Sequence, residues 1–340
     1  MFLEQTGRDY NWLDPGICLT SLISATFIVL LMFISVPVSL AKVVLTGVVV
    51  TNENTPIKYA NVTLKTRGTI TDEFGVYSIR VEEKDLDDTL KFHALGFENR
   101  DIAVRTLISN TITKIFLTVK PIELAEVNIA SNSENFKNYW CGNSESNLGY
   151  LLIDSACSGT SMALLIDNSK FISTGRIPRV KSAQVKIVNN NIGTFKMRIR
   201  FFTVDITSGK PGTDILNKSI VVESGIKKGW VNFDLEGHDI TIDQPFFVAF
   251  ESVLTESDRK MFSEKAHEVS SQVKAKTDTI KVHGSDVERT IIKGRPFGTL
   301  VGISSSNSAY KTFTCFFRKN SLCEWEKAEA VLTSRILVVQ

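Results

Sequence analysis

The chain has 340 residues, enough for two domains of ordinary size. Apolar residues make up 43% and charged residues 22%, close to soluble globular averages, which excludes a disordered chain, a collagen and a pure coiled coil. Lysine and arginine number 39 against 37 aspartates and glutamates, so the net charge is +2 and we expect no nucleic-acid partner.

Residues 15–41 contain no charged residue and are long enough, as an α-helix, to span roughly 30 Å of hydrocarbon. They are interpreted as a secretory signal cleaved after Ser39-Leu40-Ala41, as an uncleaved membrane anchor, or as a buried core helix. The preceding residues hold one basic and three acidic side chains, where a signal is usually positive. Since a strand pattern begins directly after Lys42, both signal and anchor predict export, to the periplasm, outer membrane or cell surface.

Residues 42–130 alternate apolar and polar positions over short stretches that turn residues separate about every ten positions. No stretch of helical periodicity interrupts them. The pattern predicts about seven strands forming a small β-sandwich. The expected strands include 43–50, 57–64, 76–81, 89–94, 102–104 and 112–117.

Five motifs of this region occur in the order of a known family. They are LTGVV at 45–49, PIKYANV at 56–62, GTITDEFGVYSI at 68–79, LKFHALGF at 90–97 and LAEVNI at 124–129. The region resembles the carboxypeptidase-regulatory-like domain, a transthyretin-like sandwich abundant in exported proteins of Bacteroidetes. One departure is His93-Ala94, where the family usually has a serine and an aromatic or apolar residue. The resemblance covers about a quarter of the chain and implies a rigid module that accompanies some carboxypeptidases without their activity.

An acidic turn lies at residues 71–75. Its Asp72 carboxylate is placed to accept backbone N–H bonds, and Gly75 can adopt a positive φ. A calcium site is the alternative, with Asp72 and Glu73 as its weak candidates, but two carboxylates are too few for a full set of oxygen ligands. We therefore expect a capped turn, with no bound metal and no cofactor.

Residues 131–147 are polar and are interpreted as a linker or as the entry to the next domain. Strand patterning resumes at 148–340, which predicts a second β-sandwich, similar to the jelly-roll-like domains that often follow the regulatory-like domain. The fold class is thus all-β, with two sandwiches after the N-terminal helix. Arg198 and Arg200 lie at alternate positions of one strand, so they share a face, which we expect to be solvated.

Residues 252–296 are rich in charged residues and serine and form a polar insert. Within it, Phe262, Ala266, Val269 and Val273 recur at helical spacing, and residues 255–258 resemble a capping box. One amphipathic helix of about four turns is expected, with its apolar stripe on the sheet; a mobile loop is the alternative.

No residue spacing typical of an active site is found. The four histidines have no second histidine at zinc-motif spacing, and the chain has no nucleophile elbow or phosphate loop. The histidines are His93, His238, His267 and His283. We therefore expect no enzyme activity, with Cys157 as a structural thiol or half-cystine. The alternative is a hydrolase whose residues converge from distant segments of the second domain.

Four cysteines follow the signal, an even number that in an exported protein suggests two disulfides. Three pairings are possible. The pairing local in sequence joins Cys141 to Cys157 and Cys315 to Cys323.

The sequence predicts an exported accessory or binding protein of the cell envelope, whose ligand is a glycan or an envelope protein. Exposed aromatic residues of the second sandwich are the natural contacts. The candidates are Tyr139, Trp140, Trp230 and Trp325, although tryptophan is mostly buried in proteins. A structural envelope protein held in the membrane through residues 15–41 is a further alternative.

Overall fold

The computed structural model describes residues 43–65, 67–109, 114–120, 137–145, 148–153, 158–167, 178–241, 243–272, 275–282, 285–292 and 295–340. Residues 43–340 form one compact unit. The segment 15–41, expected to be a signal or an anchor, lies outside the described residues. In the described part of the chain, no helix has the length and apolar character needed to cross a membrane.

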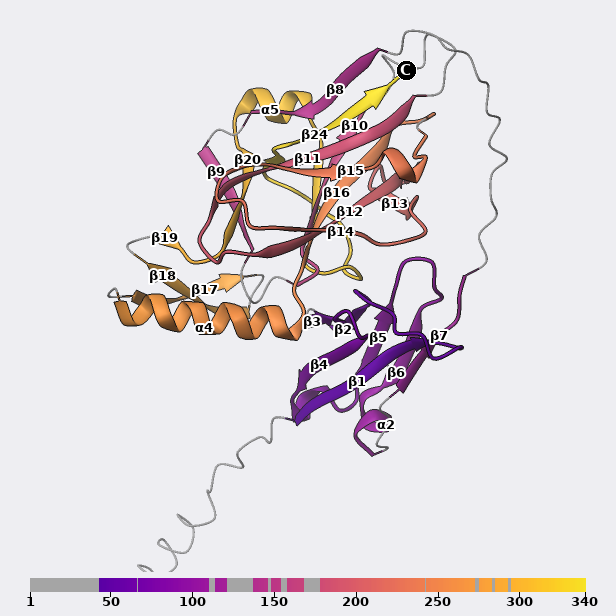
Figure 1. Cartoon of the computed structure of the whole chain (residues 1–340), viewed down its shortest axis with the longest axis vertical. Coiled ribbons are helices and arrows are strands. Elements are labelled where there is room, and N and C mark those ends of the chain that lie inside the picture. The colour runs from indigo at the N-terminus through magenta and orange to yellow at the C-terminus, as the bar shows by residue number, and fades with distance from the viewer. Residues whose placement is uncertain are drawn as a thin grey trace, which may run out of the picture. The chain divides into compact units, whose positions relative to one another are not determined.

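The N-terminal sandwich is made of two small sheets (Figure 1). Its elements are β1 (Val43–Thr51), β2 (Asn61–Leu64), β3 (Arg67–Ile70), β4 (Val76–Val81), η1 (Glu83–Asp85), β5 (Thr89–His93), β6 (Arg100–Ala103), α2 (Val104–Ser109) and β7 (Lys114–Leu117). One sheet has the order β4-β1-β7, with β7 parallel to β1, and the other has the order β3-β2-β5-β6. The expected strand at 124–129 lies outside the described residues.

Inward-facing side chains of both sheets make one core, which includes Val49, Val62, Leu90 and Ile115. Within it the rings of Tyr77 and Phe92 meet edge to face, with centroids 5.4 Å apart. Gly47 lies opposite Tyr77 in the β1–β4 register, and a Cβ there would meet the Tyr77 hydroxyl at 2.8 Å. The glycine of the first motif is therefore required by packing.

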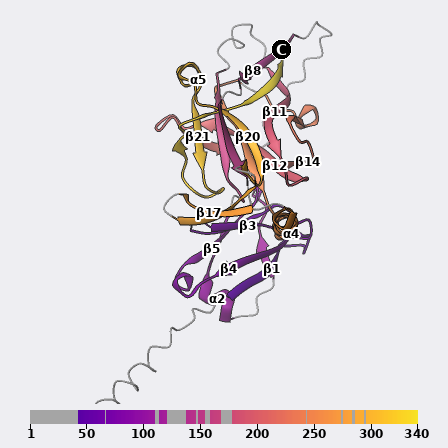
Figure 2. The ribbon, with the colours of Figure 1, turned by 90° about the vertical axis from the view of Figure 1, so that its left-hand side faces the viewer.

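The second sandwich has two larger sheets (Figure 1 and Figure 2). Its strands are β8 (Asn138–Asn143), β9 (Leu148–Ile153), β10 (Ser161–Ile166), β11 (Arg179–Asn190), β12 (Phe195–Val204), β13 (Pro211–Asp214), β14 (Ile220–Ser224), β15 (Gly229–Asp234), β16 (Phe246–Val253), β20 (Thr299–Ser304), β21 (Cys315–Arg318), β22 (Glu326–Lys327), β23 (Val331–Leu332) and β24 (Ser334–Val339). The helical segments η2 (Glu236–His238) and α5 (Asn307–Thr312) connect some of them. The all-β class, with few helices, is confirmed.

One sheet of this sandwich runs β23-β20-β11-β24-β8, with β15 on β11 and β9 on β20. The other runs β13-β12-β16-β10-β21-β22, with β14 on β12. The largest core lies between them and includes Val185, Ile199, Phe201, Phe233 and Ile336. Strand β8 falls within 131–147 and pairs with β24, so part of this segment belongs to the second sandwich; its polar bias concealed the strand.

The face of β12 that carries Arg198 and Arg200 is buried, which corrects the expectation of a solvated face. Their exposed fractions are 1% and 3%. The N-terminal sandwich covers Arg198, whose guanidinium donates to the Tyr59 carbonyl at 2.8 Å and to the Asn61 Oδ1 at 3.1 Å. Every residue of β2 is buried, because one face meets its own core and the other faces the second sandwich.

Glu251 on β16 is the centre of this buried face. It is fully buried and accepts hydrogen bonds from Arg198, from Arg200 at 3.1 Å and from Arg318 at 3.2 Å. Arg200 also pairs with Asp214 at 2.6 Å. Burial opposes ionisation of Glu251, but the three guanidinium groups outweigh it and hold the pKa of this carboxyl far below its usual range. We call these five side chains the buried charge cluster.

Further hydrogen bonds join the two sandwiches around this cluster. Asn320 donates to the Lys65 carbonyl at 3.3 Å, and Arg259 donates to the Gly68 carbonyl at 2.7 Å. Gly96 has a φ of +81°, and a Cβ there would collide with the carbonyl oxygen of Asn217. The two sandwiches therefore meet along polar backbone and buried charge.

The polar insert contains helix α4 (Glu256–Gln272). Its start is capped reciprocally, since the Thr255 N–H donates to the Asp258 carboxylate at 3.0 Å and the Asp258 N–H to the Thr255 hydroxyl at 3.3 Å. Phe262, Ala266 and Val269 pack on the core, as the spacing predicts. Val273 lies outside the described residues.

The rest of the insert is a hairpin that the sequence reasoning missed. It consists of β17 (Ala275–Val282) and β18 (Ser285–Ile292), and β19 (Arg295–Pro296) pairs with β18. Helix α4 lies beside it (Figure 1). The charged residues of these strands concealed the alternating threonine, isoleucine and valine positions that favour strands.

We predict that Glu251→Gln lowers the free energy of unfolding by about 3–5 kcal/mol, because three arginines lose their shared buried counter-charge. Urea unfolding of the full chain measures the change. The matched control is Glu236→Gln, whose carboxylate is 68% exposed and pairs with Lys181, and which should change stability by less than about 1 kcal/mol. Equal effects of the two substitutions would contradict the role given to Glu251.

Candidate functional site

Two of the four aromatic candidates, Trp140 on β8 and Trp230 on β15, lie on the outer face of one sheet. Strand alternation places them there, because their neighbours Cys141 and Val231 pack on the core. Trp140 is 46% exposed, and Trp230 is partly buried. Strands β24 and β11 run between the two tryptophans and contribute the outward-facing side chains of Arg335, Gln184 and Lys186.

Arg335 joins the two rings. Its guanidinium carbon lies 4.3 Å from the centroid of Trp140 and 4.5 Å from that of Trp230. The Lys186 ammonium lies 5.0 Å from the centroid of Trp230, its partner in the β11–β15 register. Cations at these distances are attracted to the electron-rich faces of the rings.

Two amide side chains complete the row. Arg335 donates from Nε to Gln184 Oε1 at 2.9 Å, and Gln184 donates from Nε2 to Asn232 Oδ1 at 3.1 Å. We call Trp140, Lys186, Trp230 and Arg335, with Gln184 and Asn232, the binding face. Its chemistry combines flat rings, hydrogen-bonding amides and positive charge, which can stack on a ligand and orient it.

The binding face is positively charged. Among the described residues, no carboxylate forms an ion pair with Lys186 or Arg335. Asp234 shares the outward side of β15 but lies beyond Asn232, and its carboxylate accepts the Glu236 N–H at 3.1 Å. Lys186 and Arg335 were not predicted from the sequence. For Arg335 the available signal was an isolated charge at an alternating position of an otherwise apolar strand, whereas Lys186 lies on a strand with other charged and polar residues and gave no such signal.

The other two aromatic candidates are elsewhere. Trp325 is only 6% exposed and packs edge to face on Phe202, with Arg318 over its ring at 4.3 Å. It therefore belongs to the buried side of the other sheet. Tyr139 alternates with Trp140 on β8, on the side that Cys141 turns to the core. Neither residue joins the binding face.

The acidic turn is a capped turn. The Asp72 carboxylate accepts the N–H groups of Phe74 and Val76, both at 2.9 Å, and Gly75 has a φ of +74°. Glu73 is exposed. Across the residues that the structure describes, no group of three or more histidine, cysteine, aspartate or glutamate side chains is placed to hold a metal ion.

His93 borders the buried charge cluster. Burial and the nearby Arg200 charge lower the pKa of His93 to about 4, although its Nδ1 lies 2.6 Å from Asn99 Oδ1. The imidazole is therefore neutral at pH 7.

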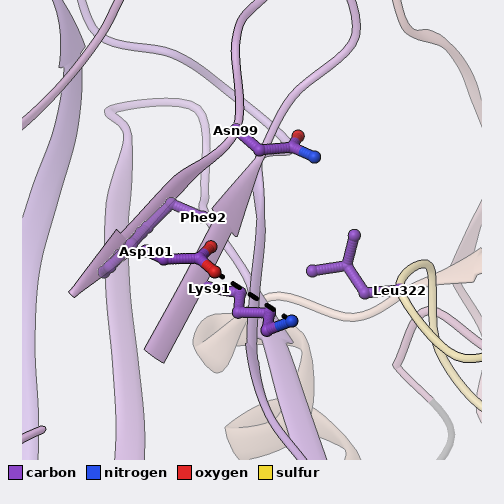
Figure 3. A pocket seen from close by; sticks show the side chains of 5 residues that line it. All are labelled: Lys91, Phe92, Asn99, Asp101 and Leu322. Carbon is purple, nitrogen blue, oxygen red and sulfur yellow. Dashed lines mark ion pairs between the residues drawn. The ribbon is translucent and has the colours of Figure 1, made fainter. Parts of the chain in front are cut away.

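A cavity of about 310 Å³ lies beside these residues. Its lining residues are Lys91, Phe92, Asn99, Asp101 and Leu322 (Figure 3). Lys91 and Asp101 pair at 4.0 Å, and both are more than half exposed. The lining contains one carboxylate, already facing a lysine, and no histidine, serine or cysteine. It brings together neither two carboxylates nor a nucleophile with a base.

The expected Cys315–Cys323 disulfide is wrong in this structure, since both residues are free thiols. Cys315 points into the core from β21 and accepts the Leu332 N–H at 3.3 Å, whereas Cys323 is partly exposed in the following turn. Strand alternation points the Cys315 side chain into the core, away from the turn that holds Cys323. Cys157 lies outside the described residues, so its expected pairing with Cys141 stays a prediction.

We predict that Cys323 reacts with iodoacetamide at pH 8 in the native protein and that Cys315 reacts only after denaturation. Burial raises the pKa of the Cys315 thiol to about 12, so little thiolate forms at pH 8. Peptide mass mapping without reductant gives the result, with Cys323→Ser as the control for site assignment. Failure of both thiols to react in denaturant would restore the disulfide.

Comparison with known proteins identifies the first sandwich. Residues 45–129 match the family model described as the CarboxypepD_reg-like domain. The resemblance in the five motifs is therefore confirmed. The match covers a quarter of the chain, so it identifies this domain and leaves the second sandwich unassigned.

No curated protein matches the chain. One similar solved structure is the cysteine protease and lectin-like domains of Cwp84, a surface layer associated protein of Clostridium difficile, at 8% identity and a TM-score of 0.32. The likeness covers 62% of this chain and 37% of that one, so this chain matches little more than a third of that structure.

Proposed function

We propose that the protein is an exported glycan-binding protein of the cell envelope, with the binding face as its ligand surface. The observation that carries this proposal is the pair of tryptophans held on one outer sheet face, with Arg335 between them. Single exposed apolar residues are common, but indole rings arranged in a row beside amides and cations favour recognition.

The arrangement of buried and exposed sheet faces supports the proposal that this surface contacts the ligand. The opposite sheet of the second sandwich has its outer face covered at Arg198 and Glu251, where the N-terminal sandwich binds it. The binding face lies on the other sheet and includes the 46% exposed ring of Trp140. A sugar ring can stack its C–H groups on such indoles while its hydroxyls bond to Gln184 and Asn232.

The proposal that the protein is exported rests on its sequence. The uncharged segment 15–41 precedes the first strand, and its interpretation as a signal or an anchor places the sandwiches outside the cytoplasm. The regulatory-like domain then acts as a rigid module of a Bacteroidetes-type envelope protein. The second sandwich has two packed sheets of seven strands each. In this proposal it serves as a jelly-roll-like binding domain.

We predict that Trp140→Ala and Trp230→Ala each weaken glycan binding at least about tenfold, because each removes a stacking ring; tenfold corresponds to about 1.4 kcal/mol. Binding of the full chain to immobilised oligosaccharides measures this, and circular dichroism verifies folding. Phe74→Ala, an exposed aromatic of the N-terminal sandwich, is the matched control and should bind as wild type. Undiminished binding by both tryptophan variants would place the ligand elsewhere.

A further inference from the structure

We infer that the ligand of the binding face is an anionic saccharide, one that carries carboxylate or sulfate groups on its rings. This inference rests on the proposed function and names the chemical class of its ligand. It starts from the charges of Lys186 and Arg335 and from the way the sheet holds them.

Two other cations of β11 have acidic partners. On β11 itself, Arg179 pairs with Asp239 at 3.2 Å and Lys181 pairs with Glu236 at 2.9 Å. Lys186 lies on the same strand, yet its ammonium forms no ion pair with a described residue and lies over the ring of Trp230. The binding face thus keeps two positive charges without a counter-charge from the part of the chain that the structure describes, which complements an anionic ligand.

The geometry of Arg335 suits a carboxylate or sulfate. Its Nε donates to Gln184 and its guanidinium carbon lies within 4.5 Å of two ring centroids, while its two Nη groups make no hydrogen bond to any described residue. A guanidinium fixed in this way keeps a fork of donors that matches two oxygens of one anionic group. Little side-chain freedom is lost on binding, because the neighbouring rings and the amide already fix the side chain.

A saccharide fits this face better than an acidic peptide does. Peptides bind sheets chiefly by adding a strand to an open edge or by filling side-chain pockets. Strands β11 and β24, which carry both cations, have neighbours on either side: β11 lies between β15 and β24, and β24 lies between β11 and β8. The cavity described above lies on other strands. Flat rings beside amides and cations instead match a chain of anionic sugar rings.

The test compares the full chain on neutral, carboxylated and sulfated oligosaccharides of equal length, with polyglutamate as the acidic peptide. We expect anionic oligosaccharides to bind at least about tenfold more tightly than neutral ones. Their binding should weaken as salt rises from 0.05 to 0.5 M, since added ions screen the contact. Arg335→Gln and Lys186→Gln should each remove most of this preference, and Arg335→Lys should keep only part of it. The exposed Arg105→Gln is the matched control.

The outcomes separate the inference from the proposal beneath it. Equal, Trp140-dependent binding of neutral and anionic oligosaccharides would overturn the anionic class while leaving glycan binding in place. Tighter binding of polyglutamate would overturn the inference in favour of a protein partner. If no oligosaccharide shows binding that depends on Trp140, the proposed function itself is overturned. Anionic preference that is lost in Arg335→Gln and retained in Arg105→Gln would support the inference.

Discussion

A single buried carboxylate organises this structure. Glu251 has no exposed surface and is shared by Arg198, Arg200 and Arg318, while Asp214 balances a second charge. Taking these ions out of water costs several kcal/mol each, and their mutual ion pairs and hydrogen bonds offset that cost. Arg198 extends the set into the N-terminal sandwich through Tyr59 and Asn61. Burial of the cluster therefore requires that the two sandwiches stay together.

This constraint also decides which outer sheet face of the second sandwich stays exposed. The sheet that carries Glu251 has its own core on one side and the N-terminal sandwich on the other. The remaining sheet shares the same core, and its outer face holds Trp140, Arg335, Trp230 and Lys186. The regulatory-like domain thus lies on the side opposite the binding face. The family match covers this domain, whereas the binding face lies on the second sandwich.

Local patterns predicted much of this fold. Alternation predicted most strands of the first sandwich, although not β3, and the two faces of β12. Helical spacing with a capping sequence predicted α4 and its apolar stripe. These features depend on residues close together in the chain. The hairpin β17–β18 was not predicted because charged residues interrupt its apolar and polar alternation. Strand β8 was not predicted because its flanking residues are polar.

Features that depend on contacts between residues distant in the chain could not be predicted from the sequence alone. Alternation placed Arg198 and Arg200 on one face but said nothing of what covers that face. In the same way, Trp140 and Trp230 are 90 positions apart, and they meet at Arg335 only because β8, β24, β11 and β15 are neighbours in that order. The free thiol of Cys315 follows from the inward side of β21, which spacing to Cys323 does not reveal.

Calorimetric unfolding of the wild-type full chain at neutral pH tests the central claim, that the buried charge cluster makes the two sandwiches one cooperative unit. A single transition for the folded sandwiches is predicted, with equal calorimetric and van't Hoff enthalpies. Two separable transitions, one for the regulatory-like domain and one for the second sandwich, would contradict it.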